Sequence, residues 1–336
     1  MDKLARLRAQ DRRDIFSEAA AQLGIRPTII EKDFWVCVVL KLLFLKSRFG
    51  KSLVFKGGTS LSKAHGLIER FSEDIDLVLD WKVIGFGEGV KDPLQNFDSK
   101  SKQNQFNKEI NRQAADFIAT TLCPELDGLL GSEGIGLSAA VGTTDPHVIN
   151  IQYAAAFSEA YIRPEVRLEI GPLASWVPSA IYTIRPYAYD ALPRVFENPA
   201  CEVVAISAER TFWEKATILH QEAHRVTQIP QRYSRHYYDL YKLAVSPVRG
   251  SAFAQPGLQD VVVFKQRFYP SAWARYDLAV PGTFKLLPTA QSQLADLERD
   301  YQEMQVMLFG KAPDFASLLD ELGKLEADIN SIGQKA

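Results

Sequence analysis

Two aspartates one residue apart, Asp74 and Asp76, are the side chains of this sequence best suited to chemistry. Alternate side chains of a β-strand point to the same face, so both carboxylates share one face while Ile75, Leu77 and Leu79 share the other. Carboxylate oxygens are ligands that Mg²⁺ prefers, and Mg²⁺ in turn binds substrate phosphates. The spacing therefore predicts a metal site for phosphate chemistry on a rigid strand.

A glycine turn lies shortly before these aspartates. Leu53, Val54 and Phe55 predict a short buried strand, and the residues after the two glycines predict the start of a helix. Glycine allows backbone N–H groups to approach phosphate oxygens closely, and neighbouring lysines add positive charge. The spacing matches neither the phosphate loop of nucleotide hydrolases nor the dinucleotide fingerprint. The candidate phosphate-binding residues are Lys56, Gly57, Gly58, Thr59, Ser60 and Lys63.

A third carboxylate is expected from another strand of the same sheet. The segment VRLEIG places Val166, Leu168 and Ile170 on one face and Arg167 and Glu169 on the other, and residues 151–157 predict the adjacent strand. From there Glu169 would complete the metal site and help to accept the proton of an attacking hydroxyl. The alternative is a solvent-facing glutamate on an edge strand.

Two later helices carry charged residues with two interpretations each. Ser207 is the expected N-cap of a helix reaching residue 222. Lys215 lies at the edge of the apolar stripe of this helix. From there its ammonium either extends to solvent or reaches a phosphate. On the next helix, Arg235 and Asp239 are spaced to form an ion pair across one turn. Alternatively, the basic groups and tyrosines there hold a nucleotide or an RNA end. The residues alone leave His236 undecided.

Composition limits the class of protein. With 336 residues, 46% of them hydrophobic, the chain can bury a substantial core, and a net charge of −2 gives no overall attraction to nucleic acid. The scattered Cys37, Cys123 and Cys201 suit buried free thiols better than a disulfide framework or a zinc site. No secretion signal is evident, and the apolar run at residues 36–45 is short and contains Lys41, which favours a core helix. We expect a cytoplasmic protein.

The order of patterns predicts three segments. Residues 1–50 read as a helical segment packing on the core, with Pro27 in the first turn of a second helix. Residues 51–195 alternate strands and helices, with a polar stretch at residues 95–108 that suits a helix or a loop. Residues 196–336 are mainly helical, with helices opening near Pro230 and covering residues 290–308 and 315–330.

Six segments occur in the order found in a known family. They are EKDFWVCVVLKLL (residues 31–43), FKGGTSLSK (55–63), RFSEDIDLVL (70–79), VRLEI (166–170), ERTFWEKATILH (209–220) and RHYYDLYKL (235–243). The chain thereby resembles the AbiEii/AbiGii toxin family of polymerase-β-like nucleotidyltransferases. The glycine and Asp-x-Asp motifs are shared with many nucleotidyltransferases, whereas the two later helical segments indicate this family.

The resemblance implies an α+β fold, with a mixed sheet flanked by helices and a mainly helical C-terminal domain. It implies Mg²⁺-dependent transfer of a nucleoside monophosphate from a nucleoside triphosphate (NTP) to a hydroxyl, with Mn²⁺ as an alternative metal. Asp74, Asp76 and Glu169 would bind the metal. Lys215, offsetting charge on the leaving pyrophosphate, and Asp239 would complete the catalytic set.

The resemblance also implies partners. The acceptor would be RNA, at the 3′ end of tRNA, and the protein would be the toxin of a type IV-like phage-defence toxin–antitoxin pair whose antitoxin is encoded nearby. Two alternatives remain at this point: transfer to a protein or a small molecule, and a module that binds nucleotide or antitoxin without turnover.

Overall fold

The computed structural model describes residues 1–72, 74–87, 89, 91–159, 163–255 and 257–332. Their contacts divide the chain into two compact units. Unit 1 comprises Met1–His65 and Phe71–Ile206, and unit 2 comprises Gly66–Arg70 and Ser207–Ala336. Unit 1 carries the strands and unit 2 is helical, so the expected α+β fold is confirmed. Glu73, within one of the family-like segments, lies outside the described residues.

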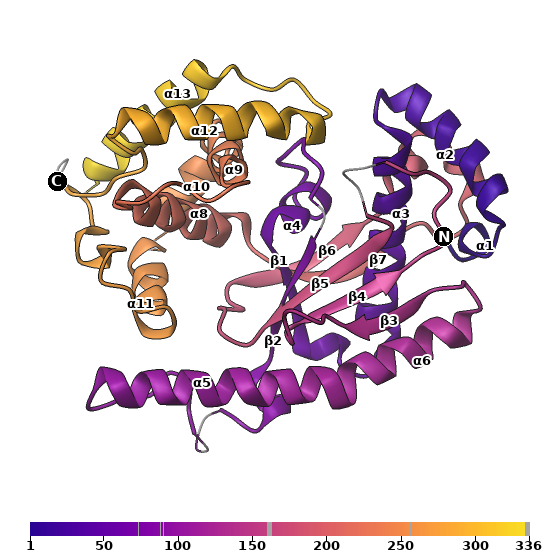
Figure 1. Cartoon of the computed structure of the whole chain (residues 1–336), viewed down its shortest axis with the longest axis horizontal. Coiled ribbons are helices and arrows are strands. Elements are labelled where there is room, and N and C mark those ends of the chain that lie inside the picture. The colour runs from indigo at the N-terminus through magenta and orange to yellow at the C-terminus, as the bar shows by residue number, and fades with distance from the viewer. Residues whose placement is uncertain (73, 88, 90, 160–162, 256, 333–336) are drawn as a thin grey trace. The chain divides into compact units, whose positions relative to one another are not determined.

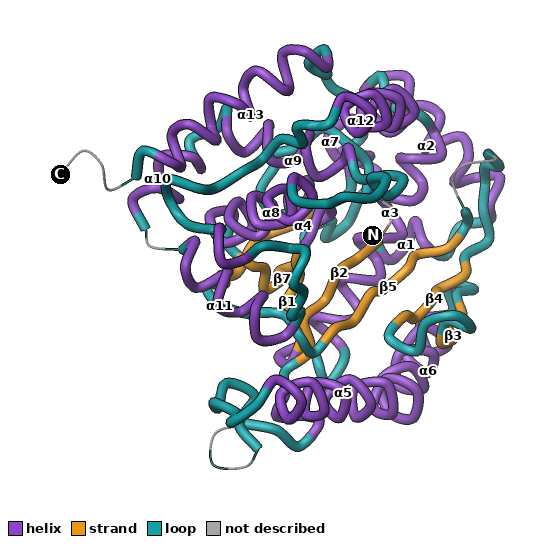
Figure 2. Tube along the Cα trace, turned by 60° about the vertical axis from the view of Figure 1, so that its left-hand side comes forward, coloured by secondary structure: helices purple, strands orange, loops and turns teal. Residues whose placement is uncertain are grey.

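Unit 1 is built on a mixed sheet whose seven described strands have the order β3-β4-β5-β2-β1-β7-β6. Figure 2 shows β1, β2, β5 and β4 side by side in that order. The pairs β2–β5 and β1–β7 are parallel, and the others are antiparallel. The strands are β1 (Leu53–Lys56), β2 (Asp74–Leu79), β3 (Ser138–Val141), β4 (Val148–Gln152), β5 (Glu165–Gly171), β6 (Ser179–Ile184) and β7 (Cys201–Ile206).

Helices of unit 1 pack on this sheet. Helix α3 is almost wholly buried and contacts β5 and β7, and α6 lies along β3 (Figure 1). The helices are α1 (Asp2–Ala5), α2 (Ala9–Leu23), α3 (Pro27–Lys41), α4 (Gly57–Lys63), α5 (Lys100–Phe117), α6 (Cys123–Glu133) and α7 (Tyr187–Ala191).

Helix α3 confirms two sequence predictions. Pro27 is its first residue, where the missing proline N–H has no helical partner to lose. The apolar run at residues 36–45 forms the end of α3 and the π-helical turn Leu42–Lys46, with most of its side chains buried. No helix within the described ranges is long and apolar enough to cross a membrane. Cys37, Cys123 and Cys201 are buried free thiols, as expected.

One predicted strand is shifted. Residues 151–157 were expected to be extended within the sheet, but β4 covers Val148–Gln152. The backbone that follows is bound by helical side chains, because Arg12 donates to the Ala154 carbonyl and Glu31 accepts from the Ala156 N–H. These contacts draw the segment away from strand pairing. The polar stretch at residues 95–108 leads into α5, which begins at residue 100.

The first helix of unit 2 is the one predicted around Lys215. The Ser207 hydroxyl accepts from the Arg210 N–H at 3.2 Å, which confirms the N-cap. The helices of unit 2 are α8 (Ala208–Ala223), α9 (Ser234–Ala244), α10 (Val248–Ala254), α11 (Leu258–Phe268), α12 (Gln291–Met304) and α13 (Phe315–Asn330).

Two helix boundaries differ from expectation. Helix α9 begins at Ser234 and not near Pro230, because the Asp300 carboxylate accepts from the Ser234 N–H at 2.7 Å and from the Arg232 N–H. Arg232 has a left-handed φ of 64°, which a helix interior does not allow. Helix α12 ends at residue 304 and continues as a single 3-10 turn. Helix α13 covers the predicted residues.

Candidate active site

The strand pairing of unit 1 places the predicted carboxylates on one face. In the parallel pair β2–β5, Asp76 lies beside Glu169 and Asp74 lies beside Arg167. Side chains that are paired across strands, or separated by one residue, point to the same face. The four side chains therefore form a two-by-two group, and the two aspartates are half-buried while Ile75 is fully buried on the opposite face.

Glu169 lies within the sheet. Strand β5 has β4 on one side and β2 on the other, so the alternative of a glutamate on an edge strand is wrong. Val166, Leu168 and Ile170 are buried, as the alternation predicted. The Glu169 side chain retains 42% exposure, which leaves its carboxylate accessible to a ligand.

The electrostatic environment of Glu169 is dominated by burial and like charge. Burial raises its pKa, the neighbouring charges of Asp76 and Asp74 raise the pKa further, and Arg167 opposes them. Crowding of anions on one face is unfavourable without a cation. The three carboxylates of Asp74, Asp76 and Glu169 are therefore suited to binding a cation.

Arg167 supplies one positive charge, although no role was predicted for it. Its Nε–H donates to Glu169 Oε1 at 3.1 Å, and its Nε lies 3.7 Å from Asp74 Oδ1. The strand alternation already placed Arg167 on the face of Glu169. Its proximity to Asp74 depends on the β2–β5 register, for which the sequence pattern carries no signal.

Gly57 approaches the Asp76 carboxylate directly. Gly57 follows β1 with a left-handed φ of 78°, and a Cβ built on it would overlap the Asp76 carboxylate, lying 2.7 Å from its Cγ. Lys56 precedes it and pairs across the strands with Asp76. The backbone of the glycine turn therefore contacts the carboxylate group, and only glycine fits there.

The hydroxyls of the turn have backbone partners. Thr59 and Ser60 are 3% and 0% exposed. Thr59 Oγ1 donates to the Asp74 carbonyl, and Ser60 Oγ donates to the Gly57 carbonyl at 2.9 Å. These bonds fix the turn and the start of β2, so the side chains support the shape of the predicted phosphate site.

Lys63 lies in the core of unit 1. Its Nζ is 2.7 Å from Asp33 Oδ1 and 3.8 Å from the centre of the Tyr187 ring, and the Lys63 and Asp33 side chains are 4% and 2% exposed. Burial opposes the ammonium charge, but Asp33 raises the pKa of Lys63 above its usual value. This position differs from the phosphate contact expected of Lys63, because the charge is already neutralised by Asp33. We therefore leave Lys63 out of the phosphate-binding set below.

Lys215 and Asp239 are brought together in unit 2. Asp239 is fully buried and accepts from Arg70 Nε at 2.6 Å and Arg70 Nη2 at 2.8 Å, while Lys215 Nζ lies 2.8 Å from Asp239 Oδ2. Lys215 Nζ also lies 2.9 Å from His236 Nδ1. An ion pair of Asp239 with Arg235 was one of two interpretations of this helix, but Asp239 instead pairs with Arg70 and Lys215 from other segments.

The charges of this cluster are set by burial and partners. Burial would raise the pKa of Asp239, but Arg70 and Lys215 outweigh it and hold the pKa well below 3.8. Burial and the Lys215 and Arg235 charges lower the pKa of His236. The imidazole is therefore neutral, with Nδ1 accepting from the Lys215 ammonium.

The donor set on the sheet suits a divalent cation. Asp74, Asp76 and Glu169 offer carboxylate oxygens on one face, the ligands that Mg²⁺ and Mn²⁺ bind. In the described part of the chain, no three His, Cys, Asp or Glu side chains are already grouped as a metal site. Arg167 contacts two of the three carboxylates, so its side chain competes with a cation for their oxygens.

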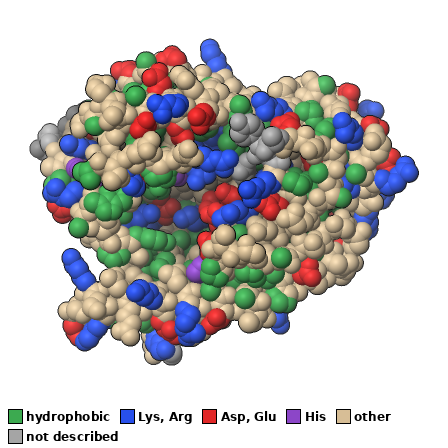
Figure 3. Space-filling view, in the orientation of Figure 1, with side chains coloured by type: hydrophobic (Ala, Val, Ile, Leu, Met, Phe, Trp, Pro, Cys, Tyr) green, Lys and Arg blue, Asp and Glu red, His purple; other side chains and the backbone are tan. Residues whose placement is uncertain are grey.

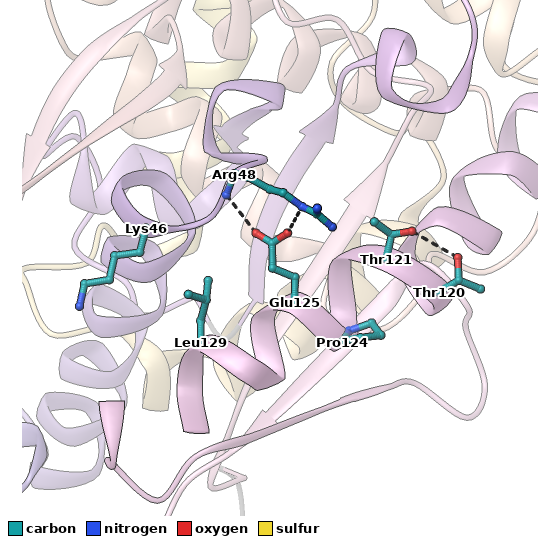
Figure 4. A pocket seen from close by; sticks show the side chains of 7 residues that line it. All are labelled: Lys46, Arg48, Thr120, Thr121, Pro124, Glu125 and Leu129. Carbon is teal, nitrogen blue, oxygen red and sulfur yellow. Dashed lines mark hydrogen bonds and ion pairs between the residues drawn. The ribbon is translucent and has the colours of Figure 1, made fainter. Parts of the chain in front are cut away.

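An open hollow elsewhere in unit 1 carries no such chemistry. It measures about 650 Å³ and is shown in Figure 4, where Glu125 binds Arg48. The Glu125 carboxylate accepts from the Arg48 N–H at 3.0 Å and from the Ser47 hydroxyl at 2.7 Å. The Arg48 guanidinium pairs with the same carboxylate and balances its charge, and we assign Glu125 to packing. The lining residues are Lys46, Arg48, Thr120, Thr121, Pro124, Glu125 and Leu129.

Comparison with known proteins identifies the family of the chain. A strand-borne carboxylate group beside a glycine turn defines a candidate phosphate-transfer enzyme. The family model described as "Nucleotidyl transferase AbiEii toxin, Type IV TA system" matches residues 39–321. The chain belongs to this family and is a nucleotidyltransferase, as its sequence resemblance implied.

The chain is similar to the solved structure of MenT4, a nucleotidyltransferase toxin from Mycobacterium tuberculosis H37Rv, with 16% sequence identity and a TM-score of 0.46 over 94% of this chain and 97% of that one. No curated protein sequence matches the chain. Membership of the AbiEii family implies an NTP substrate, a divalent metal and an antitoxin partner.

Proposed function

We propose that unit 1 transfers a nucleoside monophosphate from an NTP to an acceptor hydroxyl, with release of pyrophosphate. The observation that carries this proposal is the β2–β5 register, which sets Asp76 beside Glu169 with Asp74 on the same face. A divalent metal held there supplies charge neutralisation for the phosphates and favours the nucleophilic form of the hydroxyl. Mg²⁺ is our choice, with Mn²⁺ as the alternative.

The three carboxylates have distinct proposed tasks. Asp74 and Asp76, fixed on β2, would hold the metal, whose charge would offset that of the donor phosphate. Glu169 joins them from β5 and accepts the proton of the acceptor hydroxyl. In the absence of a metal, burial and the two aspartate charges raise the pKa of Glu169.

The glycine turn is the proposed site for the terminal phosphates. Gly57 brings backbone against the Asp76 carboxylate, so phosphates at the turn lie next to the metal ligands. Gly58, Thr59 and Ser60 continue the turn into α4, and Lys56 lies opposite Asp76 in the sheet. Backbone N–H groups and the Lys56 charge are the expected phosphate partners.

RNA is the proposed acceptor, with the 3′ end of tRNA as the specific target, and phage defence is the proposed role. Both rest on the family resemblance. Acidic and basic side chains are interspersed over the face shown in Figure 3, and the net charge is −2. RNA binding on such a surface would depend on a local group of basic residues.

For unit 2 we propose that Asp239 is a positioning residue. It binds Arg70 and Lys215 at the same time, which fixes both cations in the folded unit. Lys215 retains its proposed role of offsetting charge on pyrophosphate, as the family resemblance implies, because Arg70 and Lys215 carry two positive charges against the single negative charge of Asp239. The neutral His236 orients the ammonium through Nδ1.

The test is incubation of the purified protein with total RNA, Mg²⁺ and each α-labelled NTP in turn. Label in a tRNA-sized, RNase-sensitive band supports the proposal. Label that resists RNase and travels with protein or with a small molecule replaces RNA with that acceptor. Absence of label in every fraction, despite measured NTP binding, would favour a binding module and contradict transferase activity.

A further inference from the structure

A polar atom beside the carboxylate group is buried and without a partner. Among the described residues, the Asn150 side-chain oxygen Oδ1 accepts no hydrogen bond. Leaving a buried acceptor unsatisfied costs about 1–3 kcal/mol, so such atoms call for an explanation. Asn150 lies on β4 and pairs directly with Arg167 of β5.

The register places Asn150, Arg167 and Asp74 in one row across three neighbouring strands. Paired side chains on one face have Cβ atoms about 4.5–5.5 Å apart, within reach of an arginine. Arg167 thus has acceptors on both sides. It contacts Asp74 and Glu169 on one side. On the other side, the Asn150 oxygen accepts no hydrogen bond from any described residue.

We propose that the Arg167 side chain has two alternative positions, one of which competes with the metal for its ligands. Without metal its guanidinium pairs with Asp74 and Glu169, and with metal bound it turns to the Asn150 oxygen. This inference rests on the proposed function, because it requires that the carboxylates bind a divalent cation.

The charges favour such an exchange. Three carboxylates on one face repel one another, and Arg167 relieves this repulsion in the empty site. A divalent cation relieves it better, but it repels the guanidinium and competes for the same oxygens. Asn150 gives the displaced N–H groups a neutral acceptor, so the displaced arginine is not left unsatisfied beside the sheet.

The arrangement has a consequence for regulation of the site. Arg167 competes with the metal for Asp74 and Glu169, so it lowers metal affinity in the absence of substrate. An NTP brings negative phosphates, which favour the metal-bound arrangement. Metal and nucleotide are then expected to bind more tightly together than separately.

The test measures Mn²⁺ binding to the intact protein. The electron paramagnetic resonance signal of free Mn²⁺ reports how much of the metal remains unbound. Arg167→Gln removes the competitor and is expected to tighten Mn²⁺ binding by roughly tenfold. Asn150→Leu removes the alternative acceptor and is expected to weaken binding by about three- to tenfold. In the Arg167→Gln background the Asn150 substitution is expected to have no effect, because the arginine that it serves is absent.

Arg163→Gln is the matched control. Arg163 also carries one positive charge near β5, but its side chain is 83% exposed and its ion-pair partner is Glu165. Its removal is expected to leave Mn²⁺ affinity within about twofold of the wild type. Thermal unfolding of each variant checks that the fold is retained.

Two failures are distinguishable. If the wild type does not bind Mn²⁺, or if Asp76→Asn binds it equally well, the metal site of the proposed function is wrong. The inference about Arg167 then fails with it. If that binding is present but Arg167→Gln leaves it unchanged or weakens it, only the role of Arg167 is wrong. An equal Asn150→Leu effect in both backgrounds would overturn the proposed alternative position.

Discussion

Gly57, the first residue of α4, is in direct contact with Asp76 of β2, because a Cβ at position 57 would occupy the space of the Asp76 carboxylate. The carboxyl carbon of Asp76 would lie 2.7 Å from that added atom. This contact joins the two sequence motifs physically: the glycine turn abuts the side chain that the Asp-x-Asp strand presents. A requirement for glycine at position 57 follows from it.

Gly57→Ala is expected to lower nucleotidyl transfer by at least about a hundredfold, since Asp76 must leave its position to admit the methyl group. The left-handed φ adds a stability cost of about 1 kcal/mol. Label transfer and thermal unfolding measure the two effects. Gly24→Ala is the control, because Gly24 has a φ of 66° and nothing within 4 Å of an added Cβ. Equal loss of activity in both variants would show that backbone strain, not the Asp76 contact, is responsible.

Asp239→Asn is expected to destabilise unit 2 by about 3–5 kcal/mol, because it leaves two buried cations without their shared anion. Lys215→Met is expected to cost about half as much, since Arg70 still neutralises Asp239 through two hydrogen bonds. Denaturant unfolding measures both. Equal losses of unfolding free energy in the two variants would contradict the arrangement in which Asp239 pairs with both cations.

The same cluster predicts how stability changes with pH. The pKa of Asp239 in the folded protein is held well below 3.8, despite burial, by Arg70 and Lys215. Its contribution is therefore fully present above the unfolded pKa and is lost as pH falls through the lower folded pKa. The stability difference between wild type and Asp239→Asn should stay constant from pH 7 to about pH 5 and shrink only below about pH 4. A difference that vanishes by pH 5 would contradict an ionised, doubly paired Asp239.

Lys63 and Asp33 provide a test of structural against phosphate-binding roles. Lys63→Met alone is expected to destabilise unit 1 by about 3–5 kcal/mol, because Asp33 is left buried and unpaired. The double variant Lys63→Met, Asp33→Asn should recover most of this loss. NTP affinity, measured at a temperature where each variant is folded, should stay near the wild-type value. A large loss of NTP affinity in the stable double variant would return Lys63 to the phosphate-binding set.

Local patterns predicted much of the fold and of the carboxylate group. The alternation around Asp74 and Asp76, the alternation around Glu169 and the N-cap at Ser207 all appear in the structure, because each depends on residues close in sequence. The predicted family is confirmed by the family match over residues 39–321. The predicted metal, phosphate and catalytic roles remain proposals.

Features that depend on long-range pairing were missed. Arg167 meets Asp74 only through the register of β2 and β5, and Asn150 meets Arg167 only through the register of β4 and β5. Arg70 precedes the Asp-x-Asp strand but pairs with Asp239, far along the chain. The ion pair of Lys63 with Asp33 was also not predicted, since Asp33 comes from an earlier helix. Sequence spacing identifies side chains that can do chemistry, whereas tertiary contacts decide which charges are already neutralised.

The most direct test of the central claim compares wild type with Asp76→Asn in Mg²⁺-dependent transfer of α-label from NTP to RNA. Asp98→Asn is the control, because Asp98 is also an aspartate of unit 1 but its side chain is 86% exposed. We predict label transfer by the wild type and Asp98→Asn, its loss on addition of EDTA, and a drop of at least about a thousandfold in Asp76→Asn. Undiminished transfer by a folded Asp76→Asn variant would contradict the assignment of the catalytic site to this group of carboxylates.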